Sequence, residues 1–381
     1  MRKEKRSLKK ILLVFGTRPE AIKMCPLVAE LKSRSGVEVS VCVTGQHREM
    51  LGSVLDAFFV KPDYDLSIMR EGQTLFDVTQ SILLKMRAVI EQESPDLVLV
   101  HGDTATTFAT ALAAFYLRVP IGHVEAGLRT NNIYSPYPEE FYRRAVAIIS
   151  KYNFAPTERA RDNLIFEGYS RESVFVVGNT VIDALRTTVR GDYRHQYLDW
   201  SAGGRLIILT AHRRESIGAP LKNIFKAVRR IADDFDDVRV IYPVHMNPAV
   251  RKIASEELLG CDRIKITEPL DVIDFHNLLA RCYLAITDSG GIQEEAPALG
   301  KPVLVVRDRT ERPEGVESGG LRLVGTDEDS VYRGVRQLLE DKSRYEAMSR
   351  AVSPYGDGYA SKRIADIICE SDFPAKQEPN E

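Results

Sequence analysis

A glycine-rich stretch has the composition of a phosphate-binding turn. In TDSGGIQEE (287–295), the residues Ser289, Gly290 and Gly291 end an apolar segment and begin a helical one. A helix that starts there presents backbone N–H groups and a hydroxyl at the positive end of its dipole, where phosphate binds well. The same three residues also suit an ordinary tight turn, so the pattern alone leaves both interpretations open.

Cations that could neutralise a diphosphate follow predicted strands in both halves of the chain. They are Arg18 and Lys23 in the N-terminal half, and Arg307, Arg309 and Arg312 in the C-terminal half. Glu294 and Glu295 lie in the first turn of the glycine-led helix, where a carboxylate stabilises the helix dipole. Either carboxylate could also accept two hydrogen bonds from a ribose diol.

The N-terminal half also carries carboxylates that could exchange protons. Asp103 follows the apolar run LVLVHG, Glu125 follows IGHV, and Glu139 and Glu140 follow SPYP. A surface salt bridge or a helix cap would explain any one of them. Opposed by His212 from the other half, the set indicates an acid–base site.

The positions of the histidines and the absence of several motifs limit the ligands that the site is expected to bind. Five of the seven histidines stand where a predicted strand ends and are interpreted as its rim: His47, His101, His123, His212 and His245. Neither half has G-x-G-x-x-G after its first strand, which argues against a tightly held dinucleotide, and there is no Walker loop. No His, Cys and Asp residues have metal-ligand spacing, so we expect no metal.

The two halves of the chain repeat one order of elements, which would position these residues. Each half has an apolar strand, a loop with Arg and Glu, and an amphipathic helix; then a second strand; then a strand, a small-residue turn, a helix and a further strand. The matching ranges are 9–32 and 205–231, 37–47 and 238–248, and 96–127 and 283–308. Continuous Val, Ile and Leu strands that alternate with helices indicate parallel sheets covered on both faces.

The fold class that this order predicts is α/β, with two doubly wound Rossmann-like domains facing a central cleft. We expect an N-terminal domain over 1–178, a linker over 179–204, a C-terminal domain over 205–355 and a flexible tail over 373–381. Because open parallel sheets bind ligands beyond the carboxyl ends of their strands, we expect the site in the cleft.

Composition excludes several classes of protein. The 381 residues are 44% hydrophobic and 28% charged, as in a globular protein, and no apolar run approaches the ~20 residues that span a bilayer. The formal net charge of −2 gives no overall basic field that would attract nucleic acid. The five cysteines include no CxxC pair, and the apolar run behind the basic N-terminus is short for an export signal, so we predict a cytoplasmic location.

The motifs together resemble one family. They are GTRPEAIKMCPLV, HGDTATTFATALAAFY, GHVEAGLRT with YSPYPEE, TAHRRE, YPVHMNP, TDSGGIQEEAPALGKPV and RDRTERPEG, in unbroken order over about residues 10–370. This pattern is similar to that of the non-hydrolysing UDP-N-acetylglucosamine 2-epimerases. The resemblance implies the glycosyltransferase-B arrangement, a homodimer, a final helix near 358–371 that crosses back onto the first domain, and interconversion of UDP-GlcNAc and UDP-ManNAc without added cofactor.

The resemblance also assigns residues of this chain to a site, motif by motif. The active-site residues would be Arg18, Lys23, Asp103, Glu125, Glu139 and His212. The residues that hold UDP would be Phe275, Ser289, Gly290, Gly291, Glu295 and Arg312.

A regulatory site is a further implication of the resemblance. Bacterial relatives can bind a second UDP-GlcNAc, and Gln46, Arg213 and His245 match that pattern. Some relatives have Gln and Arg where this chain has Glu49 and Gly72. Because a carboxylate repels a diphosphate and glycine supplies no cation, we expect any such activation to be altered or weaker.

The reaction itself explains why such a site is needed. Carbon 2 of the sugar has no adjacent carbonyl, so loss of its proton alone would leave an unstabilised carbanion. If UDP leaves carbon 1 as the proton is removed, the electron pair of the C2–H bond forms the double bond of 2-acetamidoglucal. Re-addition of UDP to carbon 1, with a proton added to the other face of carbon 2, inverts the centre. We expect Asp103 and Glu125 to transfer protons, Glu139 to support them and His212 to steady the diphosphate; the sequence does not say which carboxylate removes the proton.

The same motifs are compatible with other functions. A glycosyltransferase of the same architecture would need an acceptor, a hydrolysing epimerase would release free ManNAc, and a nucleotide-sugar sensor would bind without turnover. The carboxylates and TERPEG (310–315) favour the non-hydrolysing epimerase over these three. An epimerase of a diacetamido uronate sugar stays an alternative, because the sequence gives no view of the pocket around sugar carbons 3 and 6.

Overall fold

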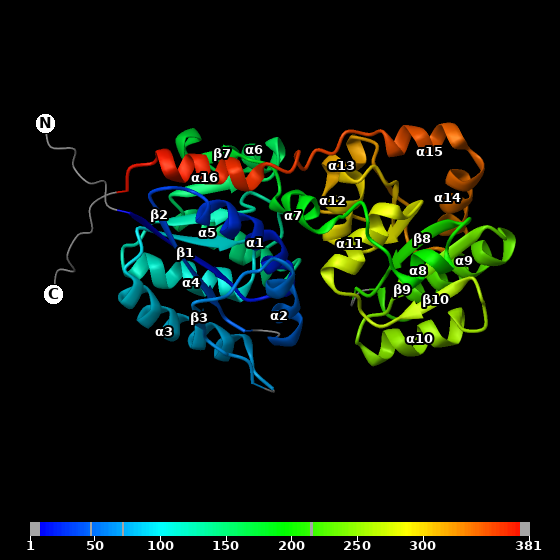
Figure 1. Cartoon of the computed structure of the whole chain (residues 1–381), viewed down its shortest axis with the longest axis horizontal. Coiled ribbons are helices and arrows are strands. Elements are labelled where there is room, and N and C mark those ends of the chain that lie inside the picture. The colour runs from blue at the N-terminus through cyan, green and yellow to red at the C-terminus, as the bar shows by residue number, and fades with distance from the viewer. Residues whose placement is uncertain (1–7, 46–47, 71, 214–215, 374–381) are drawn as a thin grey trace, which may run out of the picture. The chain divides into compact units, whose positions relative to one another are not determined.

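Runs of Val, Ile and Leu form two parallel sheets, each in its own unit of the chain (Figure 1). The computed structural model describes residues 8–45, 48–70, 72–213 and 216–373. Unit 1 comprises Met1–Thr187 and Tyr355–Glu381, and unit 2 comprises Thr188–Pro354. Among the described residues, no helix combines the length and the apolar character needed to cross a membrane.

Unit 1 contains a seven-stranded parallel sheet in the order β3-β2-β1-β4-β5-β6-β7. Its strands are β1 (Lys9–Phe15), β2 (Val37–Val43), β3 (Tyr64–Asp65), β4 (Leu97–His101), β5 (Ile121–Val124), β6 (Tyr152–Ala155) and β7 (Val174–Val176). Its helices are α1 (Arg18–Lys32), α2 (Arg48–Ala57), α3 (Leu75–Glu93), α4 (Ala105–Tyr116), α5 (Glu139–Ile149), α6 (Glu158–Phe166), α7 (Thr180–Thr188) and α16 (Ala360–Glu370), with a short 3₁₀ turn at Arg171–Ser173.

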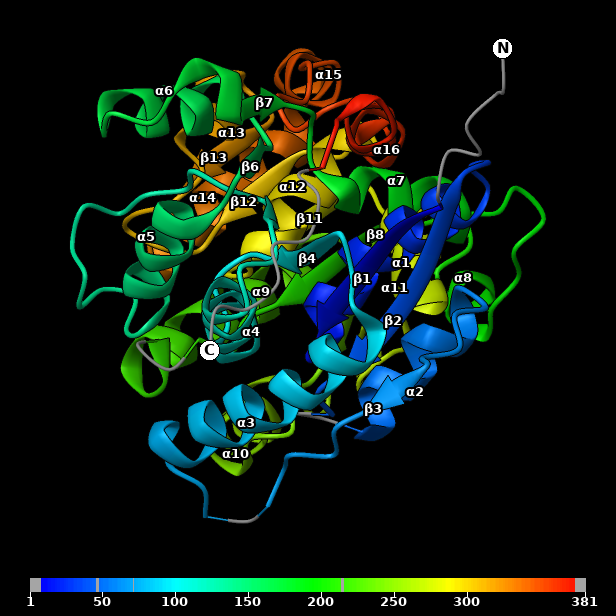
Figure 2. The ribbon, with the colours of Figure 1, turned by 90° about the vertical axis from the view of Figure 1, so that its left-hand side faces the viewer.

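Helices cover both faces of this sheet. Figures 1 and 2 show α3 and α4 over one face and α1 and α16 over the other. On the first face, Leu12 and Val14 of β1 pack with Val78 and Ile82 of α3 in one buried cluster. Alternate residues of a strand point to opposite faces, so a continuous apolar strand such as β1 is buried on both sides.

Unit 2 contains a six-stranded parallel sheet in the order β10-β9-β8-β11-β12-β13. Its strands are β8 (Arg205–Thr210), β9 (Val238–Pro243), β10 (Ile264–Thr267), β11 (Leu284–Thr287), β12 (Val303–Val305) and β13 (Leu321–Leu323). Its helices are α8 (Gln196–Trp200), α9 (Ala219–Asp234), α10 (Pro248–Leu258), α11 (Val272–Arg281), α12 (Gly290–Ala298), α13 (Pro313–Glu317), α14 (Glu328–Glu340) and α15 (Lys342–Ser349).

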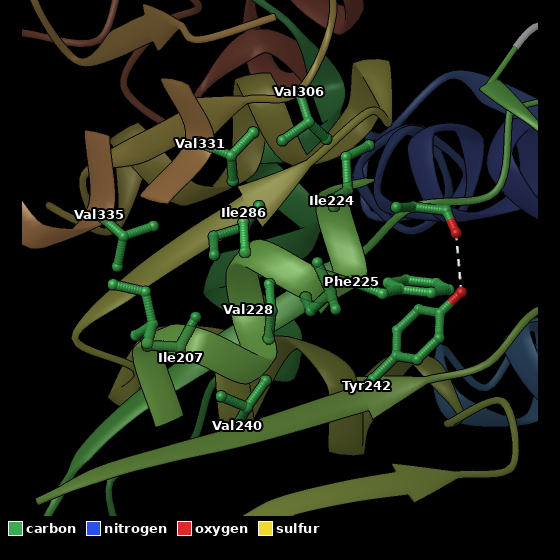
Figure 3. Close-up of a cluster of buried hydrophobic side chains, with 14 of the residues drawn as sticks. Ile207, Ile224, Phe225, Val228, Val240, Tyr242, Ile286, Val306, Val331 and Val335 are labelled. Carbon is green, nitrogen blue, oxygen red and sulfur yellow. Dashed lines mark hydrogen bonds between the residues drawn. The ribbon is translucent and has the colours of Figure 1, made fainter. Parts of the chain in front are cut away.

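Two buried clusters cover the two faces of this second sheet. Figure 3 shows the cluster between the sheet and α9 and α14, to which Ile207 of β8, Phe225, Val240 and Val335 belong. Ile208, the next residue of β8, belongs to the opposite cluster with α11 and α12. Both sheets have the strand order of doubly wound Rossmann folds, which confirms the predicted α/β class with two such domains.

The segments in which the chain leaves unit 1 and returns to it contain helices. The range 179–204, expected as a linker, contains α7 in unit 1 and α8 in unit 2, because the apolar side of α7 is buried in unit 1. The last helix, α16, packs against α1. Its C-terminus is held by Lys9, whose Nζ donates to the carbonyl oxygens of Cys369 and Ser371, each at 2.6 Å.

Candidate functional site

A buried carboxylate holds the loop between β1 and α1. The Glu20 side chain accepts hydrogen bonds from the backbone N–H groups of Gly16 (2.9 Å) and Thr17 (2.7 Å), and the Thr17 hydroxyl caps α1. The other oxygen of Glu20 accepts from the hydroxyl of Thr104 at 2.6 Å. Since α1 starts at Arg18, these bonds fix the place of that cation and tie its loop to the one that carries Asp103.

Glu125 follows β5 and lies in an unusual backbone conformation. Its φ is 66°, in the left-handed region that disfavours residues with a side chain. Its Oε2 contacts the ammonium of Lys23, accepts a hydrogen bond from Asn179 Nδ2 (2.9 Å) and lies 3.6 Å from His101 Nε2. Such conformations cost free energy and cluster at functional sites, so this residue is the strongest candidate of unit 1.

Asp103 and the start of α5 form the second group of carboxylates in unit 1. Asp103 Oδ2 pairs with the guanidinium of Arg143 on α5 at 2.6 Å. Glu140 is fully buried and pairs with Arg143 (3.3 Å) and Arg144 (3.1 Å), which makes it a structural residue. In contrast, Glu139 Oε2 is buried without a hydrogen-bond partner among the described residues. Because buried polar atoms are rarely left unsatisfied, Glu139 is the better candidate for contact with a ligand or water.

Two histidines lie on β4 and β5, the strands that precede Asp103 and Glu125. His123 is fully buried, and its Nε2 donates to the carbonyl oxygen of Gly102 at 2.7 Å. Burial disfavours the imidazolium and lowers the pKa of His123 to about 4. His101 is 4% exposed, and neither of its ring nitrogens has a hydrogen-bond partner among the described residues.

The low pKa of His123 predicts a loss of stability at acidic pH. The ordinary pKa of 6.5 applies to the unfolded chain and about 4 to the folded one, so between these values protons bind preferentially to the unfolded chain. Each unit of pH in that range costs ~1.4 kcal/mol, which gives about 2 kcal/mol by pH 5. We expect the free energy of unfolding, measured with urea, to fall from pH 7 to pH 5 in the wild type. In His123→Asn, this fall is expected to be smaller by about 2 kcal/mol. Equal losses in both proteins would contradict the prediction.

In unit 2, the glycine-rich turn lies at the N-terminus of α12 with an arginine against it. Ser289 is the N-cap residue, and Gly290 and Gly291 begin the helix. A Cβ added at Gly290 would lie 2.7 Å from Nη1 of Arg312, so only glycine lets this guanidinium approach the helix N-terminus. Arg312 is oriented by Glu294, whose Oε1 accepts from its Nε at 2.6 Å. The helix start and the guanidinium together are suited to a phosphate group.

Asp288 is a candidate supporting residue that the motifs do not single out. It is fully buried, and its Oδ2 accepts from the backbone N–H groups of His212 (2.6 Å) and Arg213 (2.7 Å). It therefore holds the loop after β8 beside the turn before α12, and the His212 ring stacks on His245 with centroids 4.8 Å apart. An aspartate directly after an apolar strand is the only signal for it in the sequence.

The remaining candidates of unit 2 surround α11 and the loop after β12. Glu295 is 8% exposed and its Oε2 lies 3.6 Å from His276 Nε2, while Phe275 packs against the cluster under α11 and α12. Arg307 donates to Glu311 at 2.9 Å. Burial opposes ionisation of Glu311, but the hydrogen bond and charge of Arg307 prevail and lower its pKa to about 2.

The candidate regulatory residues are only partly described. Gln46 lies outside the described residues, as does His47 of the expected rim. Arg213 Nη1 lies 3.6 Å from Glu311, and burial lowers the pKa of His245, with the charge of His212 acting in the same direction. Gly72 has φ of 75° and open space around its Cα.

The structure thus distributes the predicted site residues over the two units, at the carboxyl edges of the two sheets. Unit 1 carries Arg18, Lys23, Asp103, Glu125 and Glu139, and unit 2 carries His212, Phe275, Ser289, Gly290, Gly291, Glu295 and Arg312. It brings Lys23 to Glu125 and Arg312 to Gly290. Among the described residues, no group of three or more His, Cys, Asp or Glu side chains could hold a metal ion.

Comparisons with known proteins agree with the motifs. The model of the family described as UDP-N-acetylglucosamine 2-epimerase matches residues 29–369. A Bacillus subtilis (strain 168) protein named UDP-N-acetylglucosamine 2-epimerase is 56% identical over 359 residues, which are 94% of each chain.

Two solved structures are also similar to this chain. The S. aureus MnaA–UDP co-structure is 51% identical, with a TM-score of 0.90, and the match covers 95% of this chain and 96% of that one. A UDP-GlcNAc 2-epimerase from Neisseria meningitidis bound to UDP-GlcNAc is 44% identical, with a TM-score of 0.89 and coverage of 95% and 100%. Since the family model and these relatives match nearly the whole chain, it belongs to the UDP-N-acetylglucosamine 2-epimerase family of isomerases, which its motifs predict.

Proposed function

We propose that this protein interconverts UDP-GlcNAc and UDP-ManNAc without hydrolysis and without added cofactor, by elimination of UDP to 2-acetamidoglucal and re-addition. The reaction would run in the cytoplasm and supply ManNAc units for cell-surface polysaccharide. Family membership supports the substrate, since a relative of 44% identity is bound to UDP-GlcNAc. The contacts of the site residues support the chemical steps.

The proton-transfer step is assigned to carboxylates of unit 1. Glu125 and Asp103 stand on the loops after two adjacent strands, β5 and β4. Each has a cation beside it, Lys23 for Glu125 and Arg143 for Asp103, and a cation favours the ionised form that accepts a proton. Glu139, with its unsatisfied buried oxygen, supports this pair.

Departure of UDP requires stabilisation of negative charge on the diphosphate. The N-terminus of α12 with Ser289, Gly290 and Gly291, and the guanidinium of Arg312 held by Glu294, supply it in unit 2. His212, held through its backbone by Asp288, is assigned to the same diphosphate. Glu295, the carboxylate that the family motif assigns to UDP, is assigned to the ribose diol, and Glu294 orients Arg312.

The observation that carries the proposal is the contact between Glu125 and Lys23 in a chain of this family. The backbone of Glu125 is strained and its carboxylate lies against the ammonium of Lys23. The test is to incubate the purified protein with UDP-GlcNAc alone and to identify products by proton NMR. UDP-ManNAc without free sugar is the expected product. Free ManNAc with UDP would indicate a hydrolysing epimerase, and binding without turnover would indicate a sensor. Turnover that requires a sugar acceptor would indicate a glycosyltransferase.

We also propose that two copies of this chain associate through unit 1. Exposed apolar residues gather on α3, α4 and α5, which pack side by side: Phe76, Leu84, Phe115, Tyr116, Phe141 and Ile148. Exposed apolar areas of this kind mark interaction surfaces. Sedimentation is expected to give a dimer for the wild type and a monomer for Ile148→Asp, whereas a dimeric variant would exclude this face.

Activation by a second UDP-GlcNAc is expected to be weak in this protein. A carboxylate at position 49 and no cation at position 72 disfavour a second diphosphate, and Glu311 partly neutralises Arg213. The double variant Glu49→Gln/Gly72→Arg is expected to make the rate depend more steeply on UDP-GlcNAc concentration. Gly36→Arg, at a glycine with φ of 82° and open space, controls for backbone strain. An unchanged concentration dependence would count against this role.

A further inference from the structure

Asn179 joins the Glu125 carboxylate to the start of α7. The side chain is 3% exposed, and its Nδ2 donates to Glu125 Oε2 at 2.9 Å. Its Oδ1 accepts from the backbone N–H of Val181 at 3.0 Å and so caps the helix. Since an ionised carboxylate only accepts and a backbone N–H only donates, the amide serves both neighbours with one fixed orientation.

The backbone of Asn179 lies where the chain leaves unit 1 and returns to it. The chain passes into unit 2 after Thr187 and re-enters unit 1 at Tyr355. The N–H of Asn179 donates to the carbonyl oxygen of Tyr355 at 2.8 Å. A Cβ added at Gly356 would lie 3.1 Å from the Cα of Gly178, so the two segments touch through glycine backbone.

A second set of contacts fastens the same two segments one turn further on. Asp183 of α7 accepts from the backbone N–H groups of Ala360 (3.1 Å) and Ser361 (2.7 Å), which caps α16. Arg186 of α7 donates to the carbonyl oxygen of Gly358 at 3.0 Å. The outgoing and returning segments are therefore one packed unit, with Asn179 at the end that faces Glu125.

We infer that Asn179 is a positioning residue for Glu125 and that it couples this carboxylate to the two segments through which the chain passes between the units. The inference rests on the proposed function, because it takes Glu125 to exchange the proton at carbon 2. Asn179 itself transfers no proton. It fixes the rotamer of a carboxylate whose backbone is already strained, and displacement of the return segment at Gly356 moves Asn179 with it.

Three ionisable groups contact or surround Glu125 and set its charge environment. Lys23 contacts it from α1, His101 Nε2 lies 3.6 Å from it on β4, and His123 lies two residues before it on β5. None of them changes in the variants proposed below, so a change in the pH dependence reports on the amide at position 179.

The first test separates the two hydrogen bonds of the Asn179 side chain, the one to Glu125 and the one that caps α7. Asn179→Ser keeps a good helix cap but is too short to reach Glu125, and Asn179→Asp keeps the cap but replaces the donor by a second carboxyl. We expect kcat for UDP-GlcNAc to fall ~10- to 100-fold in both variants, with KM and the affinity for UDP changed less than about threefold. In Asn179→Asp, the acid limb of the kcat profile moves to higher pH, since a neighbouring carboxylate opposes ionisation of Glu125.

The matched control makes the reverse exchange at another helix cap. Asp327 caps α14 in unit 2 through a bond to the backbone N–H of Ser330, and Asp327→Asn retains that cap. This variant is expected to keep the wild-type kcat and pH profile. A wild-type kcat and pH profile in Asn179→Ser and Asn179→Asp would overturn the positioning role.

The second test addresses the coupling to the return segment. Gly356→Ala pushes a Cβ against Gly178, whereas Gly168→Ala introduces similar strain at φ of 93° with open space around it. We expect a lower kcat only in Gly356→Ala, and a double variant Asn179→Ser/Gly356→Ala that is less impaired than the product of the two single effects. Independent, multiplicative effects would refute the coupling and leave the positioning role in place.

A crystal structure of Asn179→Ser distinguishes failure of this inference from failure of the proposed function. Rotation of the Glu125 carboxylate away from its wild-type position is expected whatever reaction the protein performs. An unmoved carboxylate would overturn the inference even if the wild type is an active epimerase. An inactive wild type with a moved carboxylate would overturn the function but not the contact.

Discussion

Glu125→Gln and Asp103→Asn are each expected to lower kcat for UDP-GlcNAc epimerisation by ~100-fold or more, because general acid–base catalysis contributes about that factor. Both substitutions keep the shape of the side chain and remove its capacity to accept the proton. The affinity for UDP, measured by calorimetry, is expected to stay near the wild-type value. Glu158→Gln and Asp162→Asn, on exposed carboxylates of α6 in the same unit, are the matched controls.

Turnover in heavy water tests the mechanism behind that loss. If UDP is eliminated and re-added, the proton at carbon 2 exchanges with solvent, and UDP-ManNAc carries deuterium there. Traces of 2-acetamidoglucal and UDP are expected as well. Full retention of protium during turnover would show that the proposed elimination is wrong, and with it the roles of both carboxylates.

Arg312→Ala is expected to weaken UDP binding by ~10- to 100-fold, since a charge-assisted hydrogen bond contributes ~1.5 to 3 kcal/mol. Part of the loss comes from Glu294, which is 1% exposed and would then lack the partner that donates to it at 2.6 Å. The double variant Arg312→Ala/Glu294→Gln is therefore expected to bind UDP more tightly than Arg312→Ala alone.

Two further variants separate position from charge in this prediction. Arg312→Lys keeps the charge but loses the planar fork, so an intermediate affinity is expected. Arg322→Ala removes an exposed arginine of unit 2 that bonds to Gln337, and it is the control for loss of a positive charge. Wild-type affinity in Arg312→Ala would remove this arginine from the binding site.

The amino-acid sequence determined the two sheets and the places where chemistry occurs. Continuous apolar runs such as LVLVH and LAIT are stable only when buried on both faces, so their order along the chain specifies doubly wound sheets. The carboxyl ends of parallel strands meet at one edge, which is why Asp103, Glu125 and the turn at Ser289 could be identified as site candidates from their positions alone.

Tertiary structure alone decided which partner each of two neighbouring carboxylates contacts. Glu139 and Glu140 are adjacent in sequence, but only packing places Glu140 against two arginines and leaves an oxygen of Glu139 unsatisfied. Glu294 and Glu295 are likewise adjacent in sequence, but only the fold pairs Glu294 with Arg312 and places Glu295 beside His276. A sequence pattern specifies the face of a helix, whereas a partner distant in sequence is selected by the fold.

The residues that hold other candidate site residues in place could be identified only from the tertiary structure. Asp288 holds a loop 75 residues before it, and Asn179 holds Glu125 across 54 residues. Gly16 must be glycine because a Cβ there would lie 2.0 Å from the hydroxyl oxygen of Thr44, the residue that follows the neighbouring strand β2. Local periodicity contains no information on such contacts, because hydrogen bonds and close approaches between distant segments exist only once both sheets have folded.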